Sequence, residues 1–467
     1  MKNNYTAYEK KLTITNSLEQ MKLENESNAK ALTDICSIRE YSHLVREGVE
    51  GKIWTDALRA ALIEHEIVEI NSSKEPYYID DTVIIPSNRC IIAYRATIKL
   101  VSGCEVLMLR NENVCDGTHQ PISTNIHDEN ITIIGGKWEE SHNARGGYGK
   151  SGRFARKELG DVCFFGVSTC MLFNNLCGLT LKNVTFSHAA GFGAQMGNVK
   201  NAYFENIWFN SCYADGLHFG GNCENILARG LYGEVGDDIF ALNAYDWQNS
   251  SVTFGPIKNV LCEDVRSAPM SIYKAIRIVP GVYTYDDGSK TSCSISDTII
   301  KNVHGIKTYK MYFQTPAYSI GDEPERGEVG YINDLFFEDI DVDLDAPIDP
   351  FRQYCTSDPV CGAFGAFEIG ANVGYISFEN INAIIHKDEF PLSFLVCLGP
   401  KSIVHNGKEI FDPYISSHAE TIEFSNITIN GASTTNEDLI FRKTSFDDVN
   451  SDGHSTATAS IDKLIIS

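Results

Sequence analysis

One short pattern of apolar and polar residues recurs along most of the chain. It reads apolar, any residue, Asn or Asp, apolar. Full copies occur at residues 181–184, 204–207, 262–265, 300–303, 337–340, 378–381 and 424–427, and degenerate copies at 130–134 and 227–231. The first two full copies start 23 residues apart, and later copies are separated by longer loop sequence. A core repeat with insertions between its copies is typical of a solenoid, in which each repeat forms one coil.

The recurring Asn or Asp indicates how such a coil would turn. Both residue types hydrogen-bond to nearby backbone and tolerate a left-handed conformation, so they can end a strand at a turn. We therefore predict an all-β fold, a right-handed parallel β-helix, with equivalent strands of successive coils about 4.8 Å apart. An all-β sandwich with coincidental repeats is the alternative, although sandwich strands have no reason to share one phrase. We assign residues 51–467 to a single β-helix domain.

The first 50 residues do not follow this pattern. They are polar, rich in Glu, Lys and Asn, and contain no glycine before Gly48. The stretch Ser17–Glu40 is predicted to form an amphipathic helix. We interpret residues 1–50 as an N-terminal extension that packs on the body or on another subunit, which leaves a homo-oligomer open.

A short helix and three strands are predicted to follow this extension. The helix begins near Trp54, with Thr55 as its N-cap. Its apolar face consists of Leu58, Leu62 and Ile63. Strands are predicted at Ile67–Ile70, Pro76–Ile79 and Thr82–Pro86.

The composition narrows the class of partner. The 467 residues carry a net charge of −23 and the sequence pI is about 4.9, and so acidic a surface repels nucleic acid and anionic membranes. No stretch approaches the roughly 18 apolar residues that span a membrane, and the N-terminus lacks an apolar run like that of a signal peptide. We therefore expect a cytoplasmic protein with no nucleic-acid or membrane partner.

The cysteines are not arranged as metal ligands. None of the 14 forms a C-x-x-C pair, so their spacing does not support a tetrahedral zinc site. We expect most of them to be small hydrophobic residues in the core.

Two acidic fragments carry the candidate chemistry. Asp215 lies in Tyr-Ala-Asp-Gly-Leu-His, and Asp237 and Asp238 follow Gly236 in Gly-Asp-Asp. The 22 residues from Asp215 to Asp237 nearly match the 23-residue repeat, so the first carboxylate should lie beneath the other two, one coil away. Since neighbouring strand residues face opposite sides, the chain must kink at Gly236 for the last two to point together.

A cluster of three carboxylates suits general acid–base catalysis. Like charges at close range raise at least one pKa, so one carboxyl group can donate a proton while an ionised partner activates water. Hydrolysis of a glycosidic bond with inversion needs such a pair, ordinarily about 6.5–9.5 Å apart. Two alternatives remain: Asp-Gly and Asp-Asp are common in solvated turns, and three carboxylates can bind calcium.

These fragments resemble the polygalacturonase family of inverting glycoside hydrolases, which are right-handed β-helices of the pectate-lyase-like superfamily. Members of that family carry Asn-Thr-Asp-Gly and, about one coil later, Gly-Asp-Asp. The resemblance implies that Asp237 is the general acid and that Asp215 and Asp238 hold the attacking water.

The sequence departs from the family pattern at three places. Tyr213-Ala214 replaces Asn-Thr, and no Gly-His-Gly follows the second aspartate fragment. The family's Arg-Ile-Lys, which contacts the galacturonate carboxylate, reads Arg277-Ile278-Val279 here. Lys274 is a candidate to replace the missing lysine.

Five residues are candidates for binding the substrate. His218 shares a strand with Asp215, and a guanidinium at Arg277 can bind a carboxylate or hydroxyls with two hydrogen bonds. Aromatic rings suit the apolar faces of sugars, and two follow the aspartate pair. The candidates are His218, Arg277, Lys274, Tyr245 and Trp247.

We therefore predict an inverting glycoside hydrolase that acts on α-linked oligosaccharides, a galacturonide or a related pectic or galactoside sugar, and needs no metal or other cofactor. Without a secretion signal the substrate would be imported, which favours exo-action. A polysaccharide lyase on the same fold and a non-catalytic, tailspike-like carbohydrate-binding protein are the alternatives.

Overall fold

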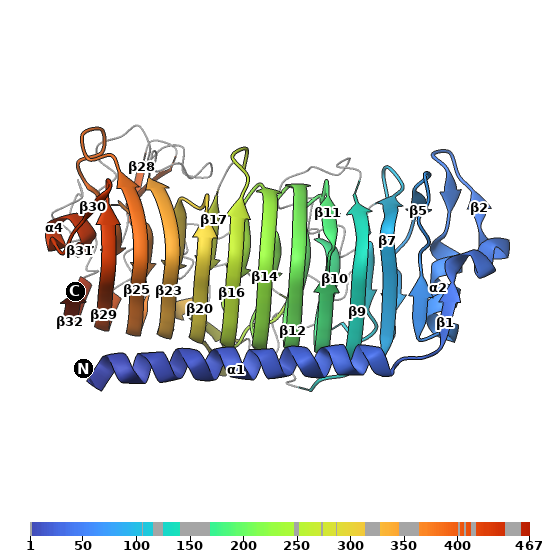
Figure 1. The fold of residues 1–467 in the computed structure, drawn as a ribbon, viewed down its shortest axis with the longest axis horizontal. Helices are drawn as coiled ribbons and strands as arrows, with labels where there is room; N and C mark the ends of the chain where they lie inside the picture. Colours follow the sequence, from blue (N-terminus) through green and yellow to red (C-terminus); the bar gives the residue numbers. More distant parts are fainter. Residues whose placement is uncertain are drawn as a thin grey trace.

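The repeated phrases stack on one another as the coils of a parallel β-helix, which confirms the predicted fold (Figure 1). The computed structural model describes residues 2–104, 106–114, 125–140, 169–246, 252–271, 274–285, 287–312, 327–344, 364–399, 402–405, 408–411, 417–443 and 459–467. Equivalent strands pair in parallel from one coil to the next, and many long strands bend so that one strand serves two faces. We distinguish a site face, a helix face and a third face.

The site face starts with the first residues of the long strands and continues with short ones. Its short strands are β6 (Val83–Ile85), β8 (Leu109–Asn111), β13 (Leu217–Phe219), β15 (Asp238–Leu242), β17 (Ala275–Ile278), β21 (Thr308–Tyr312), β24 (Phe364–Gly370), β26 (Ser393–Leu398) and β31 (Phe441–Lys443).

The helix face is built from the middle of the long strands. It comprises β1 (Ile35–Ser37), β4 (Ile67–Glu69), β7 (Arg89–Leu100), β9 (Asp128–Glu139), β10 (Thr169–Lys182), β12 (Phe192–Cys212), β14 (Cys223–Val235), β16 (Ile257–Ser267), β20 (Ile295–His304), β23 (Tyr331–Leu344), β25 (Asn372–Ile385), β29 (Ser417–Ile429) and β32 (Ala459–Ile466).

The third face takes the last residues of the long strands and a few short ones. The short strands are β3 (Lys52–Ile53), β5 (Tyr77–Ile79) and β11 (Thr185–Ser187), with β2 (Arg46–Glu47) and β30 (Ala432–Ser433) paired antiparallel at its ends. Outside the three faces lie β18 (Gly281–Thr284), β19 (Lys290–Cys293) and β22 (Gly327–Val329), and the hairpin of β27 (Ser402–His405) and β28 (Lys408–Phe411).

The Asn or Asp of the repeated phrase turns the chain from the helix face to the third face. In all seven full copies this residue has a left-handed backbone, with φ between 51° and 58°. Gly230 takes the equivalent place in the degenerate copy at residues 227–231, with φ of 75°. The side chains also bridge coils, since Asn206 donates a hydrogen bond to Asn183 at 3.2 Å and Asn426 donates one to Asn380 at 2.7 Å. The predicted left-handed turn is confirmed, whereas the hydrogen bonds named here join side chains of adjacent coils, and Asn206 lies within the long strand β12.

The interior is a continuous stack of apolar side chains. Phe378 lies between Phe337 and Phe424, with ring centroids 5.2 Å and 5.0 Å apart in stacked geometry. Ten cysteines lie in the described residues, and eight of them are buried, as predicted. Because each coil buries its apolar residues on the next, the packing fixes the strand register that positions the site face.

Helix α1 (Lys2–Ala31) covers the helix face and runs along the axis of the solenoid (Figure 1). It starts earlier than the predicted Ser17–Glu40. It also ends earlier, because Ile35–Ser37 pairs as β1 and the short 3₁₀ helix η1 (Ile38–Leu44) follows. Ile14, Leu18 and Met21 are buried against an apolar row of the strands: Tyr203, Leu227, Leu261, Ile299 and Phe336.

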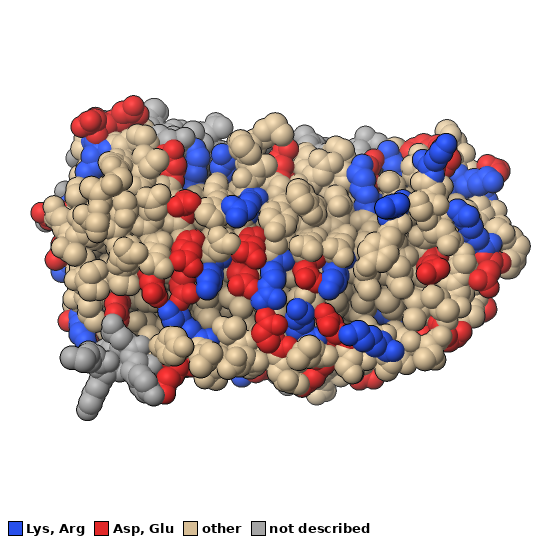
Figure 2. All heavy atoms as spheres, in the orientation of Figure 1, with Lys and Arg blue, Asp and Glu red and all other residues tan. Residues whose placement is uncertain are grey.

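Charged residues of α1 pair with charges on the strands. Lys10 lies 2.7 Å from Asp297 and 2.9 Å from Asp334, and Arg229 lies 2.6 Å from Glu19. Figure 2 shows Lys and Arg side chains interleaved with Asp and Glu along this face. The helix is thus fixed by a narrow apolar stripe with ion pairs beside it. Among the described residues, no helix has both the length and the apolar character needed to cross a membrane.

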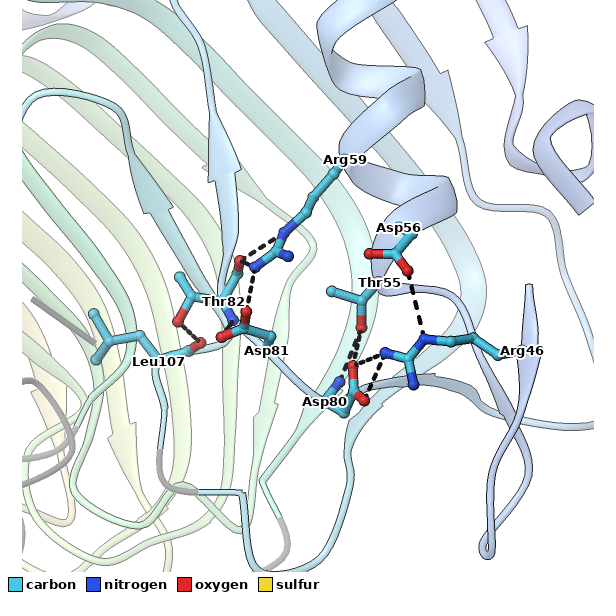
Figure 3. A network of polar contacts seen from close by, with 8 residues as sticks. All are labelled: Arg46, Thr55, Asp56, Arg59, Asp80, Asp81, Thr82 and Leu107. Carbon is cyan, nitrogen blue, oxygen red and sulfur yellow. Dashed lines mark hydrogen bonds and ion pairs between the residues drawn. The ribbon is translucent and has the colours of Figure 1, made fainter. Parts of the chain in front are cut away.

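Helix α2 (Thr55–Glu64) packs at the first coil, where the predicted helix and strands are found. Two details differ. The N-cap is Trp54, and the hydroxyl of Thr55 instead donates to Asp80 at 2.7 Å (Figure 3). Ile63 is 69% exposed, so it lies outside the buried face of the helix. Arg46 binds both oxygens of Asp80, at 2.7 and 2.8 Å, and ties the preceding segment to this end of the solenoid. A short helix, α4 (Glu437–Ile440), lies near the other end.

Candidate active site

The candidate carboxylates lie in two successive turns between the third face and the site face. The backbone N–H of Gly216 donates to the carbonyl of Asp238 at 2.9 Å, so the two turns stack as neighbouring layers. The N–H of Asp238 also donates to Oδ1 of Asp215 at 3.1 Å. One carboxylate oxygen each of Asp215, Asp237 and Asp238 lie within 4.8 Å of one another. The structure therefore places the three residues together, one coil apart.

Close backbone approach explains the glycine before the aspartate pair. A Cβ on Gly236 would lie 2.0 Å from the carbonyl oxygen of Tyr213, so only glycine lets the two layers stack there. Just after this turn the register between β15 and β17 shifts between Asp238 and Phe240. Such an irregularity re-aims side chains locally, which accounts for the shared direction of the two carboxylates.

Burial shapes the electrostatics of the cluster. The three carboxylates are only 1–4% exposed. Burial raises the pKa of Asp238 well above its usual range, and the negative charges of Asp237 and Asp215 raise it further. Neither side-chain oxygen of Asp238 has a hydrogen-bond partner among the described residues. The surroundings of Asp238 therefore favour its protonated form, which is the form that can donate a proton.

His218 joins this cluster to a fourth carboxylate. Its Nδ1 lies 2.6 Å from Oδ2 of Asp215, within hydrogen-bond distance. Its Nε2 lies 3.1 Å from Oδ2 of Asp246, where the two groups form an ion pair that lacks the geometry of a hydrogen bond. Burial lowers the pKa of His218, but its contacts with the two carboxylates outweigh this and raise the pKa to about 9. The ring of Phe192 stacks on the imidazole, with centroids 4.1 Å apart. His218 is thus a buried imidazolium beside the cluster.

A row of charged residues continues from the cluster along the site face. Nη1 of Arg277 lies 3.8 Å from Oδ2 of Asp238. Arg277 is in register with Lys310 on β21, which in turn is in register with Glu368 on β24. The charges of Arg277 and Lys310 lower the pKa of Asp238 without cancelling the upward shift. Lys274 adjoins Ala275, the register partner of Asp238, and has a left-handed backbone with φ of 46°.

The two aromatic candidates have different outcomes. The ring of Tyr245 is fully buried in the core, 5.8 Å from Phe254 and 6.2 Å from Tyr283 between centroids. It offers no face to a sugar, so the structure corrects that prediction: the residue lies after the strand ends, where period-2 alternation no longer tells inside from outside. Trp247 lies outside the described residues.

Sequence reasoning missed three residues of the site. Asp246 lies in the fragment that was considered for its aromatic residues, and Phe192 sits one coil before His218. Lys310 comes 33 residues after Arg277 along the chain, and its signal was only a short alternating strand. It supplies the second positive charge that Val279 cannot.

The cluster is tighter than inversion ordinarily requires. One oxygen from each of the three carboxylates lies within 4.8 Å of the other two, whereas the carboxyl groups of inverting pairs are usually about 6.5–9.5 Å apart and those of retaining pairs about 5–5.5 Å. The inverting outcome therefore stays a prediction. The same three oxygens are also a donor set for a hard cation, although Arg277 beside Asp238 competes for that charge.

Comparisons with known proteins concern the fold. The chain matches no family model and no curated protein. Among solved structures it is similar to the tailspike protein of Escherichia coli bacteriophage HK620, at TM-score 0.51 and 11% identity over 92% of this chain and 66% of that one. It is also similar to the family 28 exopolygalacturonase of Yersinia enterocolitica (TM-score 0.46, 10% identity, 92% of this chain and 78% of that one) and to the exopolygalacturonase of Thermotoga maritima (0.48, 12%, 88% and 97%). Polygalacturonases are thus among the structural neighbours, on a shared parallel β-helix fold.

Proposed function

We propose that this protein is a glycoside hydrolase whose reaction is carried out by the carboxylates of two stacked turns. The observation that carries the proposal is the buried cluster of Asp215, Asp237 and Asp238, in which the pKa of Asp238 is raised. Grouping like charges out of water opposes folding, so such clusters are found mainly where chemistry uses them. By analogy of fold alone, the parallel β-helix shared with polygalacturonases supports a glycosidic bond as the bond that is cleaved.

In the proposed reaction one carboxyl group donates its proton to the glycosidic oxygen as the bond to the anomeric carbon breaks. Water attacks that carbon and gives its proton to an ionised carboxylate. Resemblance to polygalacturonases assigns the donor to Asp237, whereas burial raises the pKa of Asp238 and favours its protonated form. We therefore treat the two as a pair that shares the acidic proton, with Asp215 held by His218.

The proposed substrate is an α-linked galacturonide or a related galactoside, cleaved from a chain end. Arg277 would bind the sugar carboxylate or a hydroxyl, and Lys310 stands beside it in the role of the family lysine. Since the carboxylates are nearly fully buried, the sugar reaches them only after side chains around the cluster rearrange.

The test is hydrolysis of a panel of α-linked oligosaccharides, with galacturonides and neutral galactosides, by the wild type and by Asp237→Asn. We expect turnover by the wild type and a loss of orders of magnitude in the variant, whereas Asp56→Asn, an exposed aspartate of α2, stays active. The product anomer, followed by NMR, decides between inversion and retention. Random internal cleavage would contradict exo-action.

Other outcomes assign the site differently. An unsaturated product would indicate a lyase, and activity that requires added Ca²⁺ and is lost with a chelator would indicate a metal site. Carbohydrate binding without turnover, unchanged when all three aspartates are replaced, would indicate a binding protein.

A further inference from the structure

A pair of aromatic side chains, the exposed Trp208 and the partly buried Tyr232, lies on the third face, outside the carboxylate cluster. Trp208 on β12 is 53% exposed, and Tyr232 on β14 is its register partner in the next coil. The ring centroids are 4.9 Å apart with the planes tilted by 37°. We call these two residues the aromatic pair. Cross-strand aromatic contacts stabilise sheets, but here more than half of the tryptophan surface remains in water.

The position of the aromatic pair along the solenoid is specific. The outward position that holds the two rings is occupied by polar residues in the neighbouring coils of the third face. These are Thr97, Lys137, Thr185, Arg266 and His304. Aromatic rings thus replace polar side chains in this row only in two adjacent coils of that stretch.

Those two coils are the ones that carry the carboxylates. The strand with Trp208 leads into the turn of Asp215, and the strand with Tyr232 leads into the turn of Asp237. Tyr213, in the turn between Trp208 and Asp215, is itself 37% exposed. A third exposed aromatic side chain therefore lies, along the chain, between Trp208 and the turn of Asp215.

We infer that the aromatic pair is a binding site for a polysaccharide chain, separate from the site of cleavage. Aromatic faces bind the apolar C–H faces of pyranose rings, and two rings in adjacent coils suit a chain better than a single sugar. Arg266, exposed and next to Tyr232 in the row, can bind a carboxylate of an acidic polymer. The inference rests on the proposed function only for the choice of polymer.

The experiment measures binding without turnover. All variants carry Asp237→Asn, and affinity electrophoresis in gels containing polygalacturonate or neutral galactan measures dissociation constants. We expect Trp208→Ala with Tyr232→Ala to weaken binding of at least one polymer about five- to tenfold, consistent with the loss of aromatic contacts. Trp208→Phe, which keeps a ring, should lose less. Tyr94→Ala is the matched control, since Tyr94 is 54% exposed elsewhere.

Each other outcome overturns the inference. These are equal loss in the control and the double variant, unchanged binding in the double variant, and no binding of either polymer by the parent. Sedimentation velocity tests whether a second copy of the chain binds the aromatic pair instead. A dimer that dissociates in the double variant, with polymer binding unchanged, would assign the pair to a dimer interface. Binding that depends on the pair, from a wild type that hydrolyses no sugar, would sink the proposed function and leave this inference standing.

Discussion

The carboxylate cluster and the interface of α1 treat charge in opposite ways. Along α1, cations face anions: Lys10 lies between Asp297 and Asp334, and Lys11 contacts Glu338 and Glu379. In the cluster, three carboxylates are buried together and are only partly offset by cations.

The difference distinguishes charged residues that hold the fold together from charged residues that serve a reaction. Partly exposed ion pairs contribute little stability and are screened by salt. Buried like charges lower stability, and a sequence that keeps them sacrifices stability for another purpose. The region with the least favourable electrostatics is therefore the one that points most directly to function.

The largest effect is expected when a carboxylate of the cluster is neutralised. Asp238→Asn replaces the carboxyl group with an amide that cannot donate a proton, so it should lower kcat by about 10²–10⁴. Tm should rise, because the amide avoids the cost of burying an ionisable group beside two carboxylates. Asp237→Asn should do the same if the pair shares the acidic proton. Turnover on the oligosaccharide panel and calorimetry check both effects. Full activity in either single variant would remove that residue from the acid role.

Truncation of the α1 stripe should act on stability instead. Leu18 is fully buried against the strands, so Leu18→Ala should cost about 2–5 kcal/mol of unfolding free energy. Leu23 on the same helix is 57% exposed, and Leu23→Ala should change stability by no more than about 0.5 kcal/mol. Chemical denaturation measures both. Equal losses would mean that the stripe is not what fixes the helix.

The buried imidazolium makes stability depend on pH. Because the pKa of His218 is raised from its ordinary 6.5 to about 9, its contribution is fully present below about pH 6.5 and is lost as pH rises through 9. Tm should therefore fall more between pH 6 and pH 10 in the wild type than in His218→Gln. Buried thiols with raised pKa, such as Cys212, give the same trend in both proteins, so only the difference counts. Parallel curves would contradict the ion pairs of His218.

The smallest effect is expected at the ion pairs of α1. Lys11→Ala removes contacts with Glu338 and Glu379, and should cost about 1 kcal/mol or less. At about 1 M salt the difference from the wild type should nearly vanish, since such charges are screened. A larger loss that persists in salt would show that this interface depends on charge more than on its apolar stripe.

The sequence predicted the fold because one residue per coil has a demanding conformation. Asn183, Asn206 and their equivalents need left-handed backbone, and that need leaves a visible phrase. The extent of α1 was not predictable in the same way. Where it ends is decided by Cys36 and its neighbours pairing as β1 with β4, a contact made only in the folded chain.

The site could be predicted only where coils are free of insertions. Asp215 and Asp237 are 22 residues apart, nearly one repeat, so their spacing alone predicted that they stack in adjacent coils. Lys310 follows Arg277 across a long insertion, and no fixed period brings it there. The burial of Tyr245 depends on Gly281, whose Cβ would lie 2.6 Å from the ring, and such packing leaves no trace in local alternation.

The path of α1 also has a consequence for biosynthesis. The helix is made before the coils, yet Lys11 contacts Glu379, a partner 368 residues later in the chain. At about 5–20 residues per second, the ribosome needs about 20–70 s to supply that partner. During this time the apolar stripe of α1 has no complete docking surface, and each finished coil adds to it. The last step of folding would then be the docking of α1 along a solenoid whose coils have already folded.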